Sequence, residues 1–174
     1  MLPHEHFLVA VLPIFGYILL RHRRLPSKAM AFVVFVGSQF PDIIDKPLAH
    51  SVGLLPSGRV FMHSFPFAVP IAIGILAYGF KTDRPHLSIG FVWAYATHIV
   101  ADWYPLFLNG QLPPNLFWPF MPPLPSEAVP GWAGPGAINV SLWTMVSIVI
   151  LAVTILLVAM DISVQLVNKP RDPI

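Results

Sequence analysis

Residues 87–104 read LSIGFVWAYATHIVADWY, a long apolar run that contains two ionisable side chains, His98 and Asp102. About 20 apolar residues cross a typical bilayer as an α-helix. A second run of similar character occupies residues 138–160. We expect both runs to span a membrane. Ionisable side chains inside a membrane span are costly, so His98 and Asp102 are candidates for a functional role.

Three further apolar segments precede this run, at residues 7–20, 29–40 and 65–80. Each is shorter than a full span, which leaves three alternatives: it tilts with the bundle, it extends through its flanks, or it crosses only part of the bilayer. The five segments together predict an all-α fold. We expect a polytopic membrane bundle of about five helices, forming one integral membrane domain over residues 1–174.

The composition supports the membrane class. Hydrophobic residues make up 56% of the chain and charged residues 10%, against roughly 25% charged residues in soluble domains. So little charge cannot cover the surface of a soluble protein. Basic residues cluster near helix ends and form no stripe of the kind that binds nucleic acid, so no nucleic-acid partner is expected. The chain has no cysteine, so any metal site must use imidazole and carboxylate ligands.

The segment at residues 105–137 is rich in proline, and Trp103, Trp118 and Trp132 lie in it or beside it. Proline removes backbone donors and fixes φ, which argues against a regular helix. Tryptophan is enriched at the membrane–water interface. We therefore expect a Pro/Trp-rich interfacial loop that covers one end of the bundle.

The basic residues predict the topology. Eight of the ten lie in the first connection, the third connection and the C-terminal segment, namely Arg21, Arg23, Arg24, Lys28, Lys81, Arg84, Lys169 and Arg171. Five crossings place these three regions on one side, which the positive-inside rule assigns to the cytoplasm. We expect a multi-pass cell-membrane protein with an outward-facing N-terminus and a cytoplasmic C-terminus.

This topology brings histidine and aspartate side chains from four segments to the outer face. They are His4 and His6 before the first helix, Asp42 and Asp45 after the second, His63 before the third, and His98 and Asp102 in the fourth. His98 and Asp102 are four residues apart and share one helix face. Imidazole and carboxylate groups bind zinc and related divalent ions. The pattern predicts an outward-facing metal site.

Taken singly, these residues have simpler explanations. His4 and His6 suit a solvated terminus, Asp42 suits a turn cap after Pro41, and His63 suits an interfacial position. His50, in the outer loop, is either a ligand or a bystander. The convergence of four segments favours the metal site over these separate explanations.

Three motifs resemble those of the YdjM-like membrane-bound metal-dependent hydrolases. They are the run at residues 40–45 (FPDIID), the step Met62-His63-Ser64, and the run at residues 96–102 (ATHIVAD). Residues 116–119 (LFWP) look like the family's Leu-Trp-Pro element, and residues 5–8 (EHFL) resemble its N-terminal Gly-His step. The motifs occur in the family's order over residues 5–119.

The resemblance implies a function. The family is grouped by distant similarity with the zinc-dependent phospholipase C and single-strand nuclease superfamily, which is all-helical and holds several metal ions. It implies hydrolysis of a phosphoester, without establishing the substrate, and divalent ions as cofactors, zinc favoured and two or more in number. We expect the substrate to be a membrane lipid or another amphipathic molecule at the outer face. The ligands carried over are His6, Asp42, Asp45, His63, His98 and Asp102.

Two departures leave questions open. The family commonly has Pro-Asp-x-Asp, whereas one more residue separates Asp42 from Asp45 here, which puts the role of Asp45 in question. The family's His-Arg-Gly step lacks its histidine in this chain. Either His50 or His4 replaces it, or the site holds fewer metals.

The sequence leaves more than one catalytic role open for several residues. Asp42 or Asp102 acts in catalysis or orients a histidine ligand, and Glu5 or Glu127 is a candidate general base. Two rival functions use the same residue types. One is a metal or ion transporter, and the other is a membrane protein whose metal only holds helices together.

Overall fold

The computed structural model describes residues 3–23 and 25–125, together with residues 145, 148–149 and 152. This part contains four α-helices and no strand: α1 (Pro3–His22), α2 (Lys28–Lys46), α3 (Phe65–Lys81) and α4 (Pro85–Leu108). A π-helical turn, η1 (Pro47–Ser51), follows α2, and a 3₁₀ turn, η2 (Pro114–Phe117), follows α4. The all-α class is confirmed for these residues. Apart from four isolated positions, the expected helix at 138–160 lies outside them, as do residues 126–137 of the expected loop.

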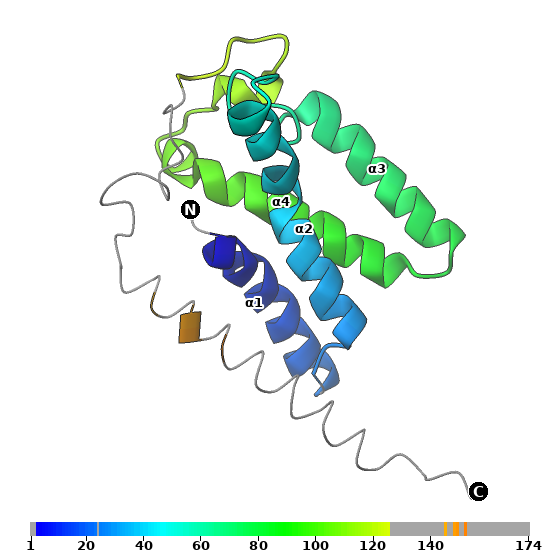
Figure 1. Ribbon diagram of the computed structural model, residues 1–174. Coiled ribbons are helices and arrows are strands. Elements are labelled where there is room, and N and C mark those ends of the chain that lie inside the picture. The colour runs from blue at the N-terminus through cyan, green and yellow to red at the C-terminus, as the bar shows by residue number, and fades with distance from the viewer. Residues whose placement is uncertain (1–2, 24, 126–144, 146–147, 150–151, 153–174) are drawn as a thin grey trace, which may run out of the picture.

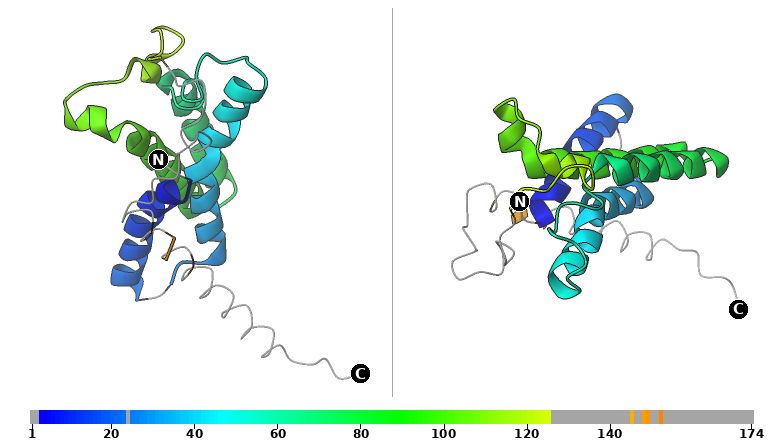
Figure 2. Two further views of the ribbon diagram at one scale, coloured as in Figure 1. Left: turned by 60° about the vertical axis from the view of Figure 1, so that its left-hand side comes forward. Right: turned by 90° about the horizontal axis from the view of Figure 1, so that it is seen from above.

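Helix α4 is the centre of the bundle. It runs across α2 and α1, and α3 returns along its other side (Figures 1 and 2). One apolar cluster joins α1, α2 and α4 through Phe7, Val34 and Ala94. A second joins α3, α4 and η2 through Ala68, Tyr95, Ile99, Trp103 and Leu116. Every other helix in the described part thus packs against the element that carries His98 and Asp102.

Helices α2 and α4 approach each other closely at Gly37. A Cβ atom added there would lie 2.6 Å from the backbone oxygen of Phe91 and 3.1 Å from Cβ of Ala94. Only glycine permits this spacing, and small residues commonly serve this purpose between membrane helices. The contact places the last two turns of α2 beside the second half of α4.

All four helices extend beyond the apolar segments that predict them, and two of these extensions bear on the site. Helix α2 continues through Pro41 to Lys46 and so includes Asp42 and Asp45. Helix α4 continues through Pro105 to Leu108, so the expectation of irregular chain from residue 105 is wrong for its first four residues. Leu106 and Phe107 pack against the second apolar cluster, and this packing offsets the backbone hydrogen bond that a proline removes.

The membrane class is supported by one helix directly. Within the described residues, α1 alone is long and apolar enough to cross a membrane, while α3 is an apolar helix of 17 residues. Helix α4 has 24 residues and is long enough to span a membrane, as expected for residues 87–104. Its polar residues Ser88, Thr97, His98 and Asp102 make its most apolar stretch less apolar than that of α1. The five-helix polytopic arrangement therefore stays a prediction.

Candidate metal centre

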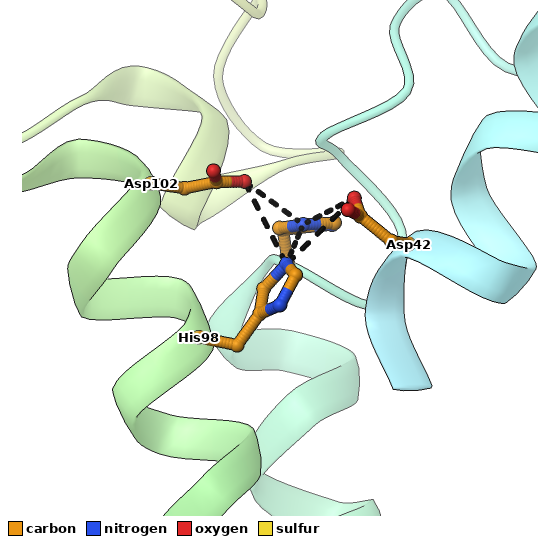
Figure 3. A group of neighbouring side chains, drawn as sticks. Asp42, His98 and Asp102 are labelled. Carbon is orange, nitrogen blue, oxygen red and sulfur yellow. Dashed lines mark hydrogen bonds and ion pairs between the residues drawn. The ribbon is translucent and has the colours of Figure 1, made fainter. Parts of the chain in front are cut away.

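Four side chains from three parts of the fold meet beside the middle of α4. Asp42 comes from α2, His63 from the loop before α3, and His98 and Asp102 from α4. Each offers one ligand atom, and these atoms all lie within 4.8 Å of one another. Figure 3 shows Asp42, His98 and Asp102 pointing toward a common centre. The structure therefore brings together four of the residues that the sequence predicts as ligands.

The ring of His63 is fixed by Asp45. Nδ1 of His63 lies 2.8 Å from Oδ2 of Asp45, and both side chains are fully buried. A carboxylate accepts, so Nδ1 carries the proton and Nε2 carries the lone pair. Nε2 of His63 lies 3.2 Å from Nε2 of His98. Asp45 thus directs the metal-binding nitrogen of His63 toward the cluster.

The ring of His98 is fixed in the same way by a backbone group. Its Nδ1 lies 2.5 Å from the carbonyl oxygen of Ser38 in α2, and a carbonyl only accepts. Pro41 lacks the N–H that would bond the carbonyl of Gly37, and its ring crowds that turn of the helix. The carbonyl of the next residue, Ser38, accepts the hydrogen bond from Nδ1 of His98.

The two facing Nε2 atoms suit a cation between them. In the neutral rings both are lone-pair acceptors, because each Nδ1–H donates a hydrogen bond to another group. The nearby carboxylates add only further acceptors: Oδ1 of Asp42 is 3.7 Å from both nitrogens, and Oδ2 of Asp102 is 3.4 Å from Nε2 of His63. No donor in the described part of the chain reaches the buried Oδ1 of Asp42. Such a set of acceptors fits a divalent metal ion.

A proton competes with a metal for His63. Burial disfavours the charged ring, but the carboxylates of Asp102 and Asp45 outweigh it and hold the pKa of His63 above its usual value of 6.5. The same negative surroundings that favour the imidazolium favour a bound cation.

Asp45 lies beside the centre rather than among its four ligands. Its Oδ1 accepts from the backbone N–H of Met62 at 2.8 Å, and its Oδ2 accepts from that of Val60 at 3.1 Å as well as from His63. Both oxygens are therefore occupied. The extra residue between Asp42 and Asp45 agrees with this different role, which is to hold the loop and its histidine.

His6 lies against the cluster from α1. Its ring stacks on that of His98, with centroids 3.8 Å apart, and its Nε2 lies 3.2 Å from Oδ1 of Asp102. Gln39 ties the start of α1 to α2 by donating to the carbonyl of Pro3 at 2.9 Å. The position of His6 suits a ligand of a second ion beside the first.

The remaining sequence candidates lie apart from the group of four ligand atoms. His4 and Glu5 occupy the first turn of α1. His50 is exposed in η1 and lies beside Gly58. Glu127 lies outside the described residues. Neither His50 nor His4 thus joins the four ligands, and His6 is the further histidine in contact with them.

Sequence reasoning missed two basic side chains in the site. Nζ of Lys46 lies 2.5 Å from Oδ2 of Asp42, and Nε of Arg59 lies 2.9 Å from Oδ2 of Asp102. They are the two basic residues that the charge pattern left on the outer side. The spacing of four residues between Asp42 and Lys46 could have predicted their ion pair. No local sequence pattern indicates that Arg59 pairs with Asp102.

The family model described as YdjM inner membrane protein matches residues 1–170. The chain belongs to this family. No curated protein and no solved structure matches it significantly.

Membership of the YdjM inner membrane protein family confirms the resemblance read from the motifs. The family's description is that of an inner membrane protein, which agrees with the membrane class that the composition predicts. The match covers all four residues of the cluster. The more distant relation to zinc-dependent phospholipases stays a prediction.

Proposed function

We propose that the protein is a membrane-bound metal-dependent hydrolase that cleaves a phosphoester of a lipid or another amphipathic substrate. The observation that carries the proposal is the pair of Nε2 atoms of His63 and His98, 3.2 Å apart and both oriented as acceptors. Asp42 and Asp102 complete a four-ligand set of nitrogen and oxygen donors, which suits zinc.

In this proposal a divalent ion would act as a Lewis acid and would neutralise charge on a phosphoryl group. The chain's own residues do the positioning. Asp45 and the Ser38 carbonyl hold the two histidine rings in the binding tautomer. Asp42 and Asp102 lie on opposite sides of the His98 ring, as Figure 3 shows. His6 is placed for a second ion, and Glu5 remains our candidate general base.

We place the site at the outer face of the cell membrane, with the C-terminus in the cytoplasm. His6 and His22 are separated along α1 by 16 residues, or about 24 Å at 1.5 Å per residue. Arg21 and His22 mark the basic end of this helix, and His6 marks the end with the metal centre. This polarity agrees with the positive-inside rule.

A transporter is disfavoured by the composition of α1. An ion pathway needs polar groups at several depths, whereas residues 7–20 contain only one polar side chain, Tyr17. The histidine and aspartate residues that meet in the described part gather at one end of that helix. An enzyme that works at one membrane face accounts for this better.

The test is metal content and phosphoester turnover on the same purified sample. We expect wild-type protein to hold a divalent ion and to release phosphate or a phosphorylated headgroup from at least one lipid of a phospholipid panel. His63→Ala and Asp102→Ala should lose both properties. His86→Ala is the matched control, because His86 lies at the first turn of α4, away from the centre. Stoichiometric metal with no turnover on any phosphoester would favour a structural metal instead.

A further inference from the structure

Two basic side chains flank the metal centre. Lys46 contacts Oδ2 of Asp42 from the end of α2, while Arg59 contacts Oδ2 of Asp102 from the loop before α3. The four candidate ligand residues are almost fully buried, but the Lys46 side chain is 20% exposed and that of Arg59 is 37% exposed. The two cationic groups therefore lie between the buried ligands and the surroundings.

Arg59 is held in place by several contacts. Its backbone carbonyl accepts from Nδ2 of Asn115 at 3.2 Å, and Asn115 is 1% exposed. Its guanidinium lies over the ring of Trp103, 5.9 Å from the centroid. A surface arginine ordinarily loses side-chain entropy when it binds a ligand. Arg59 is already ordered by its contacts with Asn115 and Trp103, so it would lose less side-chain entropy on binding a ligand.

The charges around the centre leave room for an anion. Asp42, Asp45 and Asp102 contribute three negative charges, and Lys46 and Arg59 contribute two positive ones. The net charge is one negative with neutral histidines, and one bound divalent ion would make it one positive. Each further ion would add two more. A loaded centre therefore favours an anionic ligand next to the two basic groups.

We propose that Arg59 and Lys46 form an anion-binding site at the mouth of the metal centre, which takes the phosphate group of the substrate. This inference rests on the proposed function and adds its substrate-recognising residues. Arg59 forms an ion pair with Asp102 through Nε, and its Nη groups carry further donors that suit phosphate oxygens, which a guanidinium binds in a fork geometry. The Lys46 ammonium has three donors, of which Asp42 takes one.

A lipid headgroup and a soluble phosphate ester share this chemistry. The loop that carries Arg59 and the segment around η2 also expose apolar side chains, among them Leu54, Leu112 and Phe120, which are 71%, 64% and 82% exposed. Exposed apolar side chains on the two segments that carry Arg59 and Asn115 favour an ester that is attached to acyl chains.

The test measures anion binding to the full chain in uncharged detergent. Protein is loaded with zinc, freed of excess metal and titrated by calorimetry with inorganic phosphate. In a second arm the micelles carry phosphatidic acid, or diacylglycerol, which differs only in lacking the phosphate. The variants are Arg59→Gln and Lys46→Gln. Lys81→Gln is the matched control, because Lys81 ends α3 and is exposed. Metal content is measured on every sample.

We expect zinc-loaded wild type and Lys81→Gln to bind phosphate equally. Arg59→Gln and Lys46→Gln should keep their metal but bind phosphate about tenfold more weakly or worse, since each removes a charge-assisted contact. Tighter binding of phosphatidic acid than of inorganic phosphate, with none of diacylglycerol, would identify a lipid source. Equal or weaker binding of phosphatidic acid would identify a soluble ester.

Three results would overturn the inference. The first is wild-type phosphate affinity in both variants, and the second is no phosphate binding to metal-loaded wild type. The third is loss of metal from both variants, which would show that the basic groups only hold the carboxylates. In all three, the wild type holds metal and the proposed function survives. A wild type that takes up no metal would instead remove the proposed function and this inference together.

Discussion

Asp45 and His63 form a fully buried hydrogen bond of 2.8 Å, although they are 18 residues apart in the chain. The bond fixes the proton of His63 on Nδ1 and leaves Nε2 facing His98. Asp45 also holds the loop itself through the backbone N–H groups of Val60 and Met62. One carboxylate thus links the shape of the loop to the orientation of a metal ligand.

Replacing Asp45 by asparagine should weaken metal binding. An amide NH₂ cannot accept, so the asparagine side chain cannot satisfy His63, Val60 and Met62 together. Outer partners of this kind typically change metal affinity by about 10–100-fold. Zinc titration against a chelating dye measures the effect, with Asp83→Asn as the control, because Asp83 lies in the exposed turn before α4. Unchanged affinity in Asp45→Asn would show that this bond does not orient the ligand.

The close approach of α2 and α4 predicts a second effect, at Gly37. A methyl group there meets the backbone of Phe91 at 2.6 Å, so Gly37→Ala should push the helices apart and draw the Ser38 carbonyl from His98. Overpacking of this kind costs about 1–3 kcal/mol. Gly74→Ala is the control, because nothing lies within 4 Å of a Cβ at that position. Gly37→Ala should unfold more readily in detergent and bind zinc more weakly than Gly74→Ala. Equal stability and equal zinc affinity in the two variants would contradict the packing argument.

Much of the centre could be predicted from sequence. The basic connections predict which helix ends lie together, and His98 and Asp102 are one turn apart on one face. From this the sequence predicts that Asp42, His63, His98 and Asp102 lie close together, and the structure confirms that these four residues meet. Because imidazole and carboxylate groups are metal ligands, the same residues predict a site for a divalent ion.

The roles within the centre could not be predicted, because they depend on contacts through space. Nothing local in the sequence shows that backbone N–H groups of Val60 and Met62 occupy both oxygens of Asp45. The helix end after Pro41 was also uncertain, because a proline ends some helices and only bends others. The partner of Arg59 depends on a loop whose path is fixed by Asn115, far along the chain.

That loop supplies a third prediction. Asn115 donates to the carbonyl of Arg59 and accepts from the backbone N–H of Leu124 at 2.9 Å. Asn115→Ala removes two hydrogen bonds made by a side chain that is 1% exposed, and at about 0.5–1.5 kcal/mol for each bond it should cost about 1–3 kcal/mol of unfolding free energy. Asn109→Ala, at the exposed C-terminal cap of α4, should cost much less. Denaturant unfolding in detergent compares the two, and equal losses would argue against the clamp.

His6 should matter less than the four ligands. It contacts Asp102 and stacks on His98, so His6→Ala should lower the number of ions bound per chain or weaken binding, while one ion remains. His22→Ala, at the other end of the same helix, should leave both quantities unchanged. Elemental analysis after zinc loading gives the count. Complete loss of metal in His6→Ala would move His6 into the primary ligand set, and wild-type binding would remove it from the centre.

The most direct test of the account is an anomalous difference map from crystals of the zinc-loaded protein, recorded at the zinc absorption edge. The account predicts a strong peak between Nε2 of His63 and Nε2 of His98, within coordination distance of Asp42 and Asp102. A loaded protein whose only peaks lie elsewhere, or one that binds no ion at this position, would contradict it.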